Sequence, residues 1–253
     1  VALFRERHDY ISGRRRFESK SAGGGLMNAW CLFEQSGTFR DAFIKNGIKA
    51  VCVDIRDDYG KTDIIVDLFG QIANERHGRT IFENIQKDDI VFAFFPCIRF
   101  TEKNSLNARC KGGGMLNKSD FEKLCYSSNL INETAQYYEL FCNLFKIAHK
   151  RGFKMVVENP HNTAFNFLKT FFPLTPQVII ADRAKYGGDY FKKPTAFWFV
   201  NFEPQNNMIF ENVNVPKIKR IQVDCGKHGG NKLRSEISPS FADRFLREFV
   251  LTN

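Results

Sequence analysis

The sequence predicts an α/β fold in which a mostly parallel β-sheet carries helices on both faces. Short, continuous runs of apolar residues recur along the chain, and segments with helical periodicity separate them. Continuous apolar runs, unlike runs that alternate with polar residues, are typical of strands that are buried on both faces. The chain has 253 residues, of which 43% are hydrophobic. This is enough for a sizeable core in one such domain.

The first half of the chain alternates between strand and helix patterns. Ala29–Phe33 is a short apolar run that leads into a turn at Ser36-Gly37. Thr38–Asn46 then carries apolar residues at helical spacing, and Gly47 is a typical helix stop. Three further apolar runs predict strands, namely Ala50–Val53 before Asp54, Ile64–Val66 before Asp67, and Ile90–Phe95 before Pro96-Cys97.

A long amphipathic helix is predicted from Ser119 to Arg151, with Gly152 as its end. The apolar residues expected on its inner side are Leu130, Tyr137, Leu140, Phe141, Leu144 and Phe145. Met155–Val157 follows as another apolar strand, and it leads into Glu158-Asn159-Pro160.

Residues 1–26 differ from the rest of the chain. They contain the basic run Arg14–Arg16 and the glycine run Gly23–Gly25, just before Met27. This pattern predicts an added leader or tag, or else a disordered basic arm. A single folded domain is then expected to span residues 27–253.

The composition narrows the class of protein. Lys and Arg outnumber Asp and Glu by 37 to 28, and the net charge of +9 favours a polyanionic partner such as a nucleic acid. The basic, Gly-rich stretch from Arg99 to Lys118 is expected to be a loop that closes over a substrate, or else a solvated surface loop.

No apolar run is long enough to span a membrane. The seven cysteines include no C-x-x-C pair, which argues against a zinc site or a disulfide framework and indicates a reducing compartment.

Polar residues follow each predicted strand. They are Glu34 to Gly37, Asp54, Asp67, Cys97 and Glu158. In open parallel sheets, ligands bind beyond the carboxyl ends of the strands, so we expect these residues to line one site.

Two of these strand ends suggest how a cofactor could bind. The turn at Gly37 and the helix amides after it could receive a carboxylate or a phosphate. Asp54, at the end of the next strand, could accept hydrogen bonds from two ribose hydroxyls. The alternative is an ordinary strand–helix turn with a surface acid. The dinucleotide pattern G-x-G-x-x-G is absent, which argues against NAD.

Two other strand ends suggest reactive groups. Cys97 follows a buried strand and a proline, and basic residues such as Arg99 could lower the pKa of its thiol. The alternative is a buried structural cysteine. Glu158 could be kept protonated by partial desolvation and serve as a proton donor near Cys97. The alternative is a strand-terminal acid before an Asn-Pro turn.

Taken in order, these segments resemble the motifs of the cytosine-5 DNA methyltransferases. The segments are Leu32-Phe33-x-x-x-Gly37-x-Phe39, Asp54, Phe95-Pro96-Cys97 and Val157-Glu158-Asn159. A later segment resembles the variant seen in small phage-type members, namely Tyr186-Gly187 with Lys192-Lys193-Pro194-Thr195-x-x-Trp198. The closing segment looks like the family's last motif, a turn and a helix that return beside the cofactor, namely Arg234-Ser235-Glu236-Ile237-Ser238-Pro239-Ser240-Phe241-Ala242. The resemblance extends over residues 28–250.

The resemblance implies a Rossmann-like methyltransferase fold and an enzyme that methylates carbon 5 of cytosine in DNA. It implies that Cys97 is the nucleophile, that Glu158 supplies the carboxyl and that Asn159 holds the base edge. The cofactor S-adenosyl-L-methionine is expected at Phe33, Glu34, Ser36, Gly37, Phe39, Asp54, Ile55, Asp67 and Pro96. Substrate contacts are expected from Arg99, Lys193 and Thr195. A cytoplasmic protein encoded by a bacterium or a phage is expected.

The chain also departs from the family pattern. Only one glycine of the Gly-rich turn remains, and Glu34 in that turn could instead meet the cofactor's amino group. Lys192 and Lys193 stand where larger members carry arginines. Roughly forty residues separate Trp198 from Arg234, so a target recognition domain is reduced or absent. Two alternatives therefore remain open: the same chemistry on RNA or a free pyrimidine nucleotide, or a non-catalytic nucleic-acid-binding subunit with this fold.

Overall fold

The computed structural model describes residues 27–101, 104, 107–110, 115–161, 166–214 and 236–252. Three sequence expectations lie wholly or partly outside these residues. They are the leader or arm at 1–26, much of the closing loop at 99–118, and the start of the closing motif at Arg234-Ser235.

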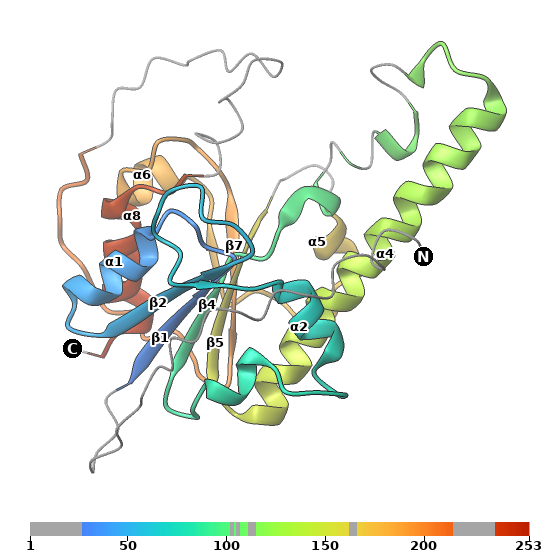
Figure 1. Cartoon of the computed structure of the whole chain (residues 1–253). Coiled ribbons are helices and arrows are strands. Elements are labelled where there is room, and N and C mark those ends of the chain that lie inside the picture. The colour runs from blue at the N-terminus through green and yellow to red at the C-terminus, as the bar shows by residue number, and fades with distance from the viewer. Residues whose placement is uncertain are drawn as a thin grey trace.

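A seven-stranded sheet forms the centre of the described chain, in the order β3-β2-β1-β4-β5-β7-β6 (Figure 1). The strands are β1 Asn28–Leu32, β2 Lys49–Asp54, β3 Ile64–Ile65, β4 Ile90–Ala93, β5 Lys154–Pro160, β6 Val178–Ile180 and β7 Thr195–Val200. The first five strands are parallel, whereas β7 runs antiparallel to both β5 and β6. The predicted mostly parallel α/β sheet is therefore confirmed.

Helices cover both faces of the sheet (Figure 1). On one face lie α1 (Thr38–Lys45), α6 (Arg183–Gly187), α8 (Pro239–Phe245) and the π-helical turn η4 (Leu246–Val250). On the other lie α2 (Leu68–Asn74), α4 (Asp120–Arg151) and α5 (Phe167–Phe171). Two short 3₁₀ turns, η1 (Ile81–Asn84) and η2 (Cys97–Arg99), flank β4. Within the described residues, no helix combines the length and apolarity that crossing a membrane requires.

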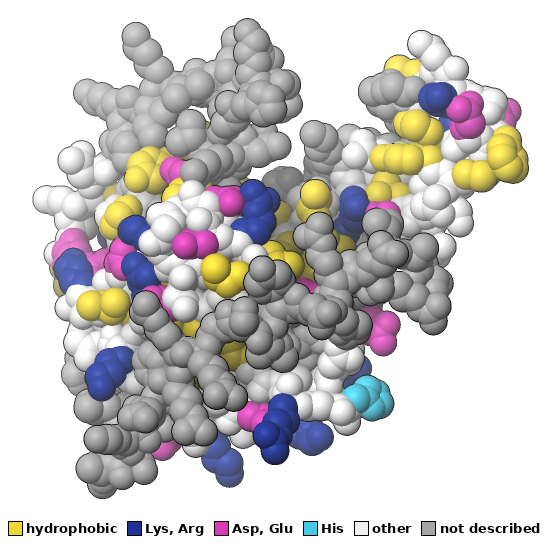
Figure 2. Space-filling view, in the orientation of Figure 1, with side chains coloured by type: hydrophobic (Ala, Val, Ile, Leu, Met, Phe, Trp, Pro, Cys, Tyr) yellow, Lys and Arg dark blue, Asp and Glu magenta, His cyan; other side chains and the backbone are white. Residues whose placement is uncertain are grey.

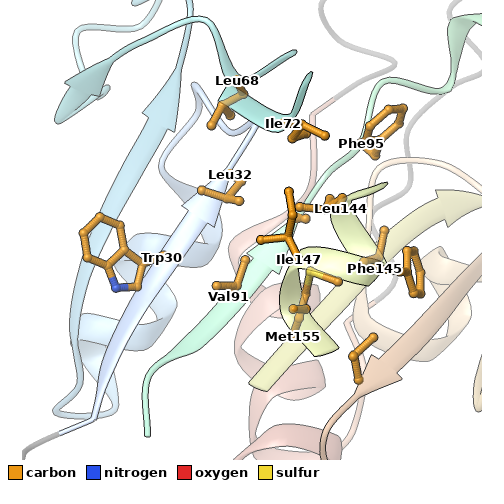
Figure 3. Packing of buried hydrophobic residues seen from close by; sticks show 14 of the residues in the cluster. Trp30, Leu32, Leu68, Ile72, Val91, Phe95, Leu144, Phe145, Ile147 and Met155 are labelled. Atoms are coloured by element: carbon orange, nitrogen blue, oxygen red, sulfur yellow. The ribbon is translucent and has the colours of Figure 1, made fainter. Parts of the chain in front are cut away.

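Each face of the sheet has its own hydrophobic core. Figure 3 shows the core beneath α2 and α4, where Leu32 and Val91 of the sheet lie near Leu68 and Leu144 of the helices. The core beneath α1 and α8 is rich in phenylalanine. There the ring of Phe92 lies 4.3 Å, centroid to centroid, from that of Phe39. Edge-to-face and offset ring pairs of this kind fill the volume and explain why the chain needs so many of its 27 Phe residues.

The long helix α4 begins and ends where the sequence predicts. Ser119 and Glu122 form a reciprocal capping box at its start, and Gly152 ends it in a left-handed conformation with φ of 79°. Of the residues expected on the inner side, Leu130, Phe141, Leu144 and Phe145 are buried, whereas Tyr137 and Leu140 are half-buried.

A buried aspartate joins the starts of β1 and β4. Asp89 is 2% exposed, and its carboxylate accepts hydrogen bonds from the backbone N and Nδ2 of Asn28, from Nε1 of Trp30 and from the backbone N of Gln86. These four donors would lose their partner without the carboxylate.

Replacing Asp89 by alanine is expected to lower the free energy of unfolding by about 3 kcal/mol, because it removes a buried carboxylate that accepts four hydrogen bonds, one of them from the buried indole of Trp30. Urea denaturation followed by circular dichroism measures this loss. Asp88→Ala is the matched control, since Asp88 is exposed and adjacent. Equal losses in the two variants would contradict the role assigned to Asp89.

Candidate active site

The carboxyl ends of four parallel strands meet at one edge of the sheet. Leu32 of β1 lies opposite Val53 of β2 and Ala93 of β4, and Ala93 lies opposite Val157 of β5. The residues that follow these positions therefore start at the same level. The strand order reverses between β1 and β4, and such a switch point is where open α/β sheets bind ligands.

Cys97 follows β4, one of the two strands at this switch point. It begins η2, just after β4 and Pro96, and its side chain is partly exposed. Burial raises the pKa of the Cys97 thiol, the ammonium of Lys193 acts in the opposite direction, and the carboxylate of Glu158 raises it further. Lys193 and Glu158, which come from distant parts of the chain, therefore both lie within electrostatic reach of Cys97.

The expectation that Arg99 lowers the pKa of Cys97 is wrong. The guanidinium of Arg99 forms an ion pair with Glu133 of α4 and lies 5.9 Å from the ring centroid of Tyr137. The cation that favours the Cys97 thiolate is Lys193, and burial outweighs it. Arg99 is thus held against α4, and its expected contact with substrate remains a prediction.

The raised pKa of Cys97 predicts how its alkylation depends on pH. Because only the thiolate reacts, the rate with iodoacetamide is expected to rise through a midpoint above that of an exposed thiol. Lys193→Met should move this midpoint higher, since it removes a cation that lowers the pKa of Cys97. Mass spectrometry of the Cys97 peptide gives the rates. Lys192→Met is the control because that side chain is exposed, and an unchanged midpoint in Lys193→Met would contradict the assignment.

Glu158 and Asn159 lie at the end of β5, and both are buried. Nδ2 of Asn159 donates to the carbonyl oxygen of Phe95 at 3.0 Å, which ties β5 to the segment that carries Cys97. Within the described residues, Oδ1 of Asn159 and Oε1 of Glu158 have no hydrogen-bond partner. Buried oxygens of this kind normally find a donor, so both atoms are suited to meet a ligand.

Arg183 is a functional candidate that the sequence interpretation missed. Its side chain is 1% exposed at the start of α6, and Nη1 lies 3.7 Å from Oε1 of Glu158. The guanidinium also forms an ion pair with Asp189 and lies 4.7 Å from the ring centroid of Phe241. Only the proximity of Asp189 in the sequence hints at this buried cluster, because nothing local distinguishes Arg183 from a surface arginine.

Asp189 links this cluster to the closing motif. Its Oδ1 accepts hydrogen bonds from the backbone N of Tyr190 at 2.8 Å and from that of Ser238 at 2.9 Å. Ser238 caps α8, and its Oγ accepts from the backbone N of Phe241 at 3.2 Å. The described part of the closing motif is thus a turn and a helix, as the resemblance implies, and it packs against Arg183 and Asp189 beside Glu158.

The other two expected substrate residues lie at the start of β7. Oγ1 of Thr195 donates to the carbonyl oxygen of Lys193 at 2.9 Å, and Thr195 is fully buried. Thr195 faces Pro160 in the register of β5 and β7. This pairing places Lys193 beside the end of β5, with its side chain half-buried. Thr195 therefore supports the backbone of Lys193 rather than presenting its own hydroxyl.

The position of Glu34 differs from the expectation that the turn after β1 binds a cofactor. Its carboxylate turns inward and accepts hydrogen bonds from the backbone N of Phe39 at 2.8 Å and of Arg40 at 3.3 Å. Sγ of Cys52 also lies 3.5 Å from its Oε2, and burial raises the pKa of Glu34. The first amides of α1, expected to receive a carboxylate or phosphate, are therefore already occupied by a group of this chain.

Gly37 and Phe39 also differ from the expectation. Gly37 has a left-handed φ of 70°, and the side chains of Arg40 and Lys61 cover it so closely that a Cβ would lie 2.9 Å from Cδ of Lys61. Phe39 is fully buried in the core beneath α1. Neither residue offers a surface to a cofactor, because the side chains of Lys61 and Arg40 cover Gly37 and core residues surround Phe39. Ser36 is half-buried, and its Oγ lies 3.0 Å from Oγ1 of Thr38.

Asp54 is the last residue of β2, as its place in the sequence predicts. Asp54 is 6% exposed, and its Oδ1 accepts from Nε2 of Gln35 at 3.1 Å and from the backbone N of Arg56 at 2.9 Å, while burial raises its pKa. Beside it, the side chain of Ile55 is 57% exposed. An oriented carboxylate next to an exposed apolar side chain suits the ribose and the base of a nucleoside.

Three further residues expected at the cofactor surround this position. Phe33 is half-buried with a left-handed φ of 59°, which is uncommon for a residue with a bulky side chain. Its ring lies 5.4 Å from that of Phe95, beside the half-buried Pro96. Asp67 is exposed and caps α2, since its Oδ1 accepts from the backbone N of Phe69 at 3.1 Å. Strained backbone at Phe33 is typical of sites that bind ligands.

A cavity of about 510 Å³ lies elsewhere, between α6, the start of α8 and residues 211–214. It is lined by none of the residues expected to react or to bind the cofactor. The chemistry at Cys97, rather than this cavity, therefore defines the candidate site. In the part of the chain that the structure describes, no group of three or more His, Cys, Asp or Glu side chains is placed to hold a metal ion.

Comparison with known proteins does not identify the chain. No protein-family model matches it. Curated protein sequences include none with significant similarity to it. The case for a function therefore depends on the geometry of the candidate site and on the motifs in the sequence.

Proposed function

We propose that the protein is an S-adenosyl-L-methionine-dependent methyltransferase that acts on carbon 5 of cytosine in DNA. One observation carries the proposal: the thiol of Cys97 follows β4 at the switch point of the sheet, and the carboxyl of Glu158, near the end of the neighbouring β5, is close enough to raise the pKa of that thiol. A nucleophile beside a proton-holding carboxyl is the pair that activating a pyrimidine ring requires. The motif order described above supplies the choice of cytosine.

The residues at the end of β2 fit the nucleoside half of the cofactor. Asp54 would accept hydrogen bonds from the ribose, and the exposed Ile55 with the ring of Phe33 would contact the base. Glu34 satisfies the first amides of α1, so these amides are not assigned to the methionine carboxylate. When bound, S-adenosyl-L-methionine supplies an electrophilic methyl group to the carbon that Cys97 and Glu158 activate.

The reaction proposed for Cys97 and Glu158 begins at carbon 6 of the pyrimidine ring, next to the carbon that receives the methyl group. The thiolate of Cys97 forms a bond to carbon 6, the electron pair of the ring double bond moves toward carbon 5, and Glu158 holds a proton at ring N3. Carbon 5 thereby becomes nucleophilic. After transfer, N3 returns its proton to Glu158 and carbon 5 loses its proton to a water molecule. The electron pair of that C–H bond forms the double bond between carbons 5 and 6 as the bond between Sγ and carbon 6 breaks, so that Cys97 leaves as the thiolate and the ring is restored.

The surroundings support these two roles. Burial raises the pKa of the Cys97 thiol more than Lys193 lowers it, so the thiolate would form when a bound substrate favours it. Asn159 fixes the segment before Cys97 through the carbonyl oxygen of Phe95, and its free Oδ1 is available to a base amino group. Arg183 holds positive charge beside Glu158 and so orients its carboxylate. A target base in a duplex would have to leave the stack to reach this pair.

A substrate without a duplex is the second candidate, and a specific observation favours it. Between β7 and α8, the described residues 201–214 form an extended segment whose Asn207 bonds to the end of the C-terminal helix. They form no separate domain that could read a DNA sequence. The same chemistry on RNA or on a free cytidine nucleotide is therefore a defined alternative for the same site.

Transfer of labelled methyl from S-adenosyl-L-methionine to four substrates tests the proposal. The substrates are duplex DNA, single-stranded DNA, RNA and dCMP, and digestion followed by mass spectrometry locates the methyl group. Label on carbon 5 of cytosine in DNA is the expected result. Label confined to RNA or dCMP would favour the second candidate. Absence of transfer together with absence of cofactor binding would support a non-catalytic subunit and overturn both.

A further inference from the structure

The N-terminal half of α4 projects away from the sheet (Figure 1). Between Asp120 and Asn129 none of its residues is buried, and Leu130 is the first that is. Figure 2 shows hydrophobic side chains gathered on this projecting end. Phe121 is 76% exposed, Leu124 70% and Ile131 55%, and isolated exposure of one such residue would be ordinary.

These side chains follow a regular spacing. Phe121, Leu124, Ser128, Ile131 and Ala135 are separated by three, four, three and four residues, and all five are exposed. We call this set the α4 seam. A spacing of three and four aligns residues along one side of a helix, and it is the pattern by which helices pair with other helices.

Farther along α4, residues on the same side of the helix pack against the α5 region. The next two positions of the spacing are Tyr138 and Cys142, followed by Phe145. The ring of Tyr138 lies 5.5 Å from that of Phe167, and the ring of Phe145 lies 4.9 Å from that of Phe172. The α4 seam thus lies in line with residues that pack against the α5 region. No described residue covers the α4 seam itself.

The charge of the projecting end argues against nucleic acid as the occupant. Residues 115–135 contain two lysines and three acidic residues, in a chain whose net charge is +9. A surface that binds phosphates would carry an excess of basic residues. The residues that flank the middle of the α4 seam are uncharged, namely Cys125, Ser127, Asn132 and Thr134. Repulsion between like charges therefore does not oppose the approach of an identical helix.

The order of side-chain sizes suits an antiparallel pair. Phe121 stands at one end of the α4 seam, Ala135 at the other, and Ser128 is at its midpoint. If the α4 helix of a second copy lies antiparallel to the first and is aligned with it at Ser128, each Phe121 lies opposite an Ala135. The two Ser128 side chains then meet at the centre. Large residues then meet small ones, as close packing requires, and the two hydroxyls can hydrogen-bond to each other.

We infer that the α4 seam is the contact by which two copies of this chain form an antiparallel, twofold-symmetric dimer. The contact is isologous, as in most dimers of identical chains. The seam is only about 21 Å long, so the dimer is expected to be reversible and its proportion to rise with protein concentration. The inference depends on the exposed helix face and not on the reaction proposed for Cys97.

Sedimentation equilibrium of the full chain tests the inference. The wild-type protein is expected to approach the mass of two chains as its concentration rises. Leu124→Glu with Ile131→Glu should weaken dimerisation by about 100-fold, because it places charges in an apolar contact. Asn129→Glu with Gln136→Glu is the matched control, since both residues are exposed but lie off the seam. All four side chains are exposed, so thermal unfolding measured at a concentration that keeps every variant monomeric should not change.

Cysteine crosslinking tests the geometry. In a Cys125→Ser background, Ser128→Cys is expected to form a disulfide between two chains when copper phenanthroline accepts the two electrons. Gln136→Cys in the same background should remain monomeric. The mass of a single chain at every concentration, or equal weakening by the control pair, would overturn the inference. Crosslinking through position 136 but not 128 would also overturn it.

Discussion

Replacing Cys97 by serine is expected to lower methyl transfer by about 10⁴-fold or more, while cofactor binding stays within about twofold of the wild type. A serine hydroxyl is nearly isosteric with the thiol but does not supply an anionic nucleophile beside Glu158 and Lys193. Asp54 and Ile55, which are expected to bind the cofactor, come from a different strand. Single-turnover transfer of labelled methyl gives the rate, and calorimetric titration gives the cofactor affinity.

A matched variant separates this effect from a general loss of cysteine. Cys125 is exposed on α4, far along the chain from the candidate site, so Cys125→Ser should keep full activity. A covalent complex with DNA that contains 5-fluorocytosine should form with wild type and with Cys125→Ser. It should be absent with Cys97→Ser. Substantial turnover by Cys97→Ser would refute the covalent mechanism and leave only the fold-based part of the proposal.

Replacing Glu158 by glutamine is expected to lower the rate of methyl transfer by about 10³-fold, because the amide cannot give a proton to ring N3. Glutamine keeps the size of the side chain, so the packing at the end of β5 is conserved. It does remove the negative charge beside Arg183, which then keeps Asp189 as its carboxylate partner. We therefore expect a loss of stability of about 1–2 kcal/mol, small beside the kinetic effect.

The pH dependence of adduct formation distinguishes the two roles of Glu158. Its carboxylate raises the pKa of Cys97, so Glu158→Gln should lower the pKa of the thiol and make alkylation by iodoacetamide faster at neutral pH. Transfer would fall while the thiol becomes more reactive. Glu139→Gln, an exposed residue of α4, is the control and should change neither rate. A parallel fall of both rates would indicate local unfolding instead of a lost proton donor.

Much of the fold follows from local sequence. The apolar runs that end at Asp54, Asp67 and Cys97 become parallel strands, and each of those polar residues lies at or just after the strand end. Helix ends are equally local, because a capping box at Ser119 and a left-handed Gly152 need only neighbouring residues. That such strand ends converge then follows from the handedness of parallel connections.

Other features depend on contacts between distant residues. The sequence interpretation does not specify β6 or β7, and the reversed direction of β7 is what brings Lys193 to the end of β5. Glu34 looks like a cofactor ligand in the sequence, yet the amides of Phe39 and Arg40 attract it inward. Arg99 looks like the partner of Cys97, yet Glu133 of α4 captures it.

The sequence by itself determined the order of strands β1 to β5 with helices α1 and α4 between them, the position of Cys97 and Glu158 at strand ends, and the bounds of α4. These features depend on hydrophobic periodicity, helix caps and chain direction, all of which act over a few residues. Only the tertiary structure decided that Arg183 is buried beside Glu158, that Lys193 rather than Arg99 lowers the pKa of Cys97, and that no described residue covers the α4 seam. Such pairings are set by which charges and apolar surfaces the folded chain brings together, and spacing along the sequence does not encode them.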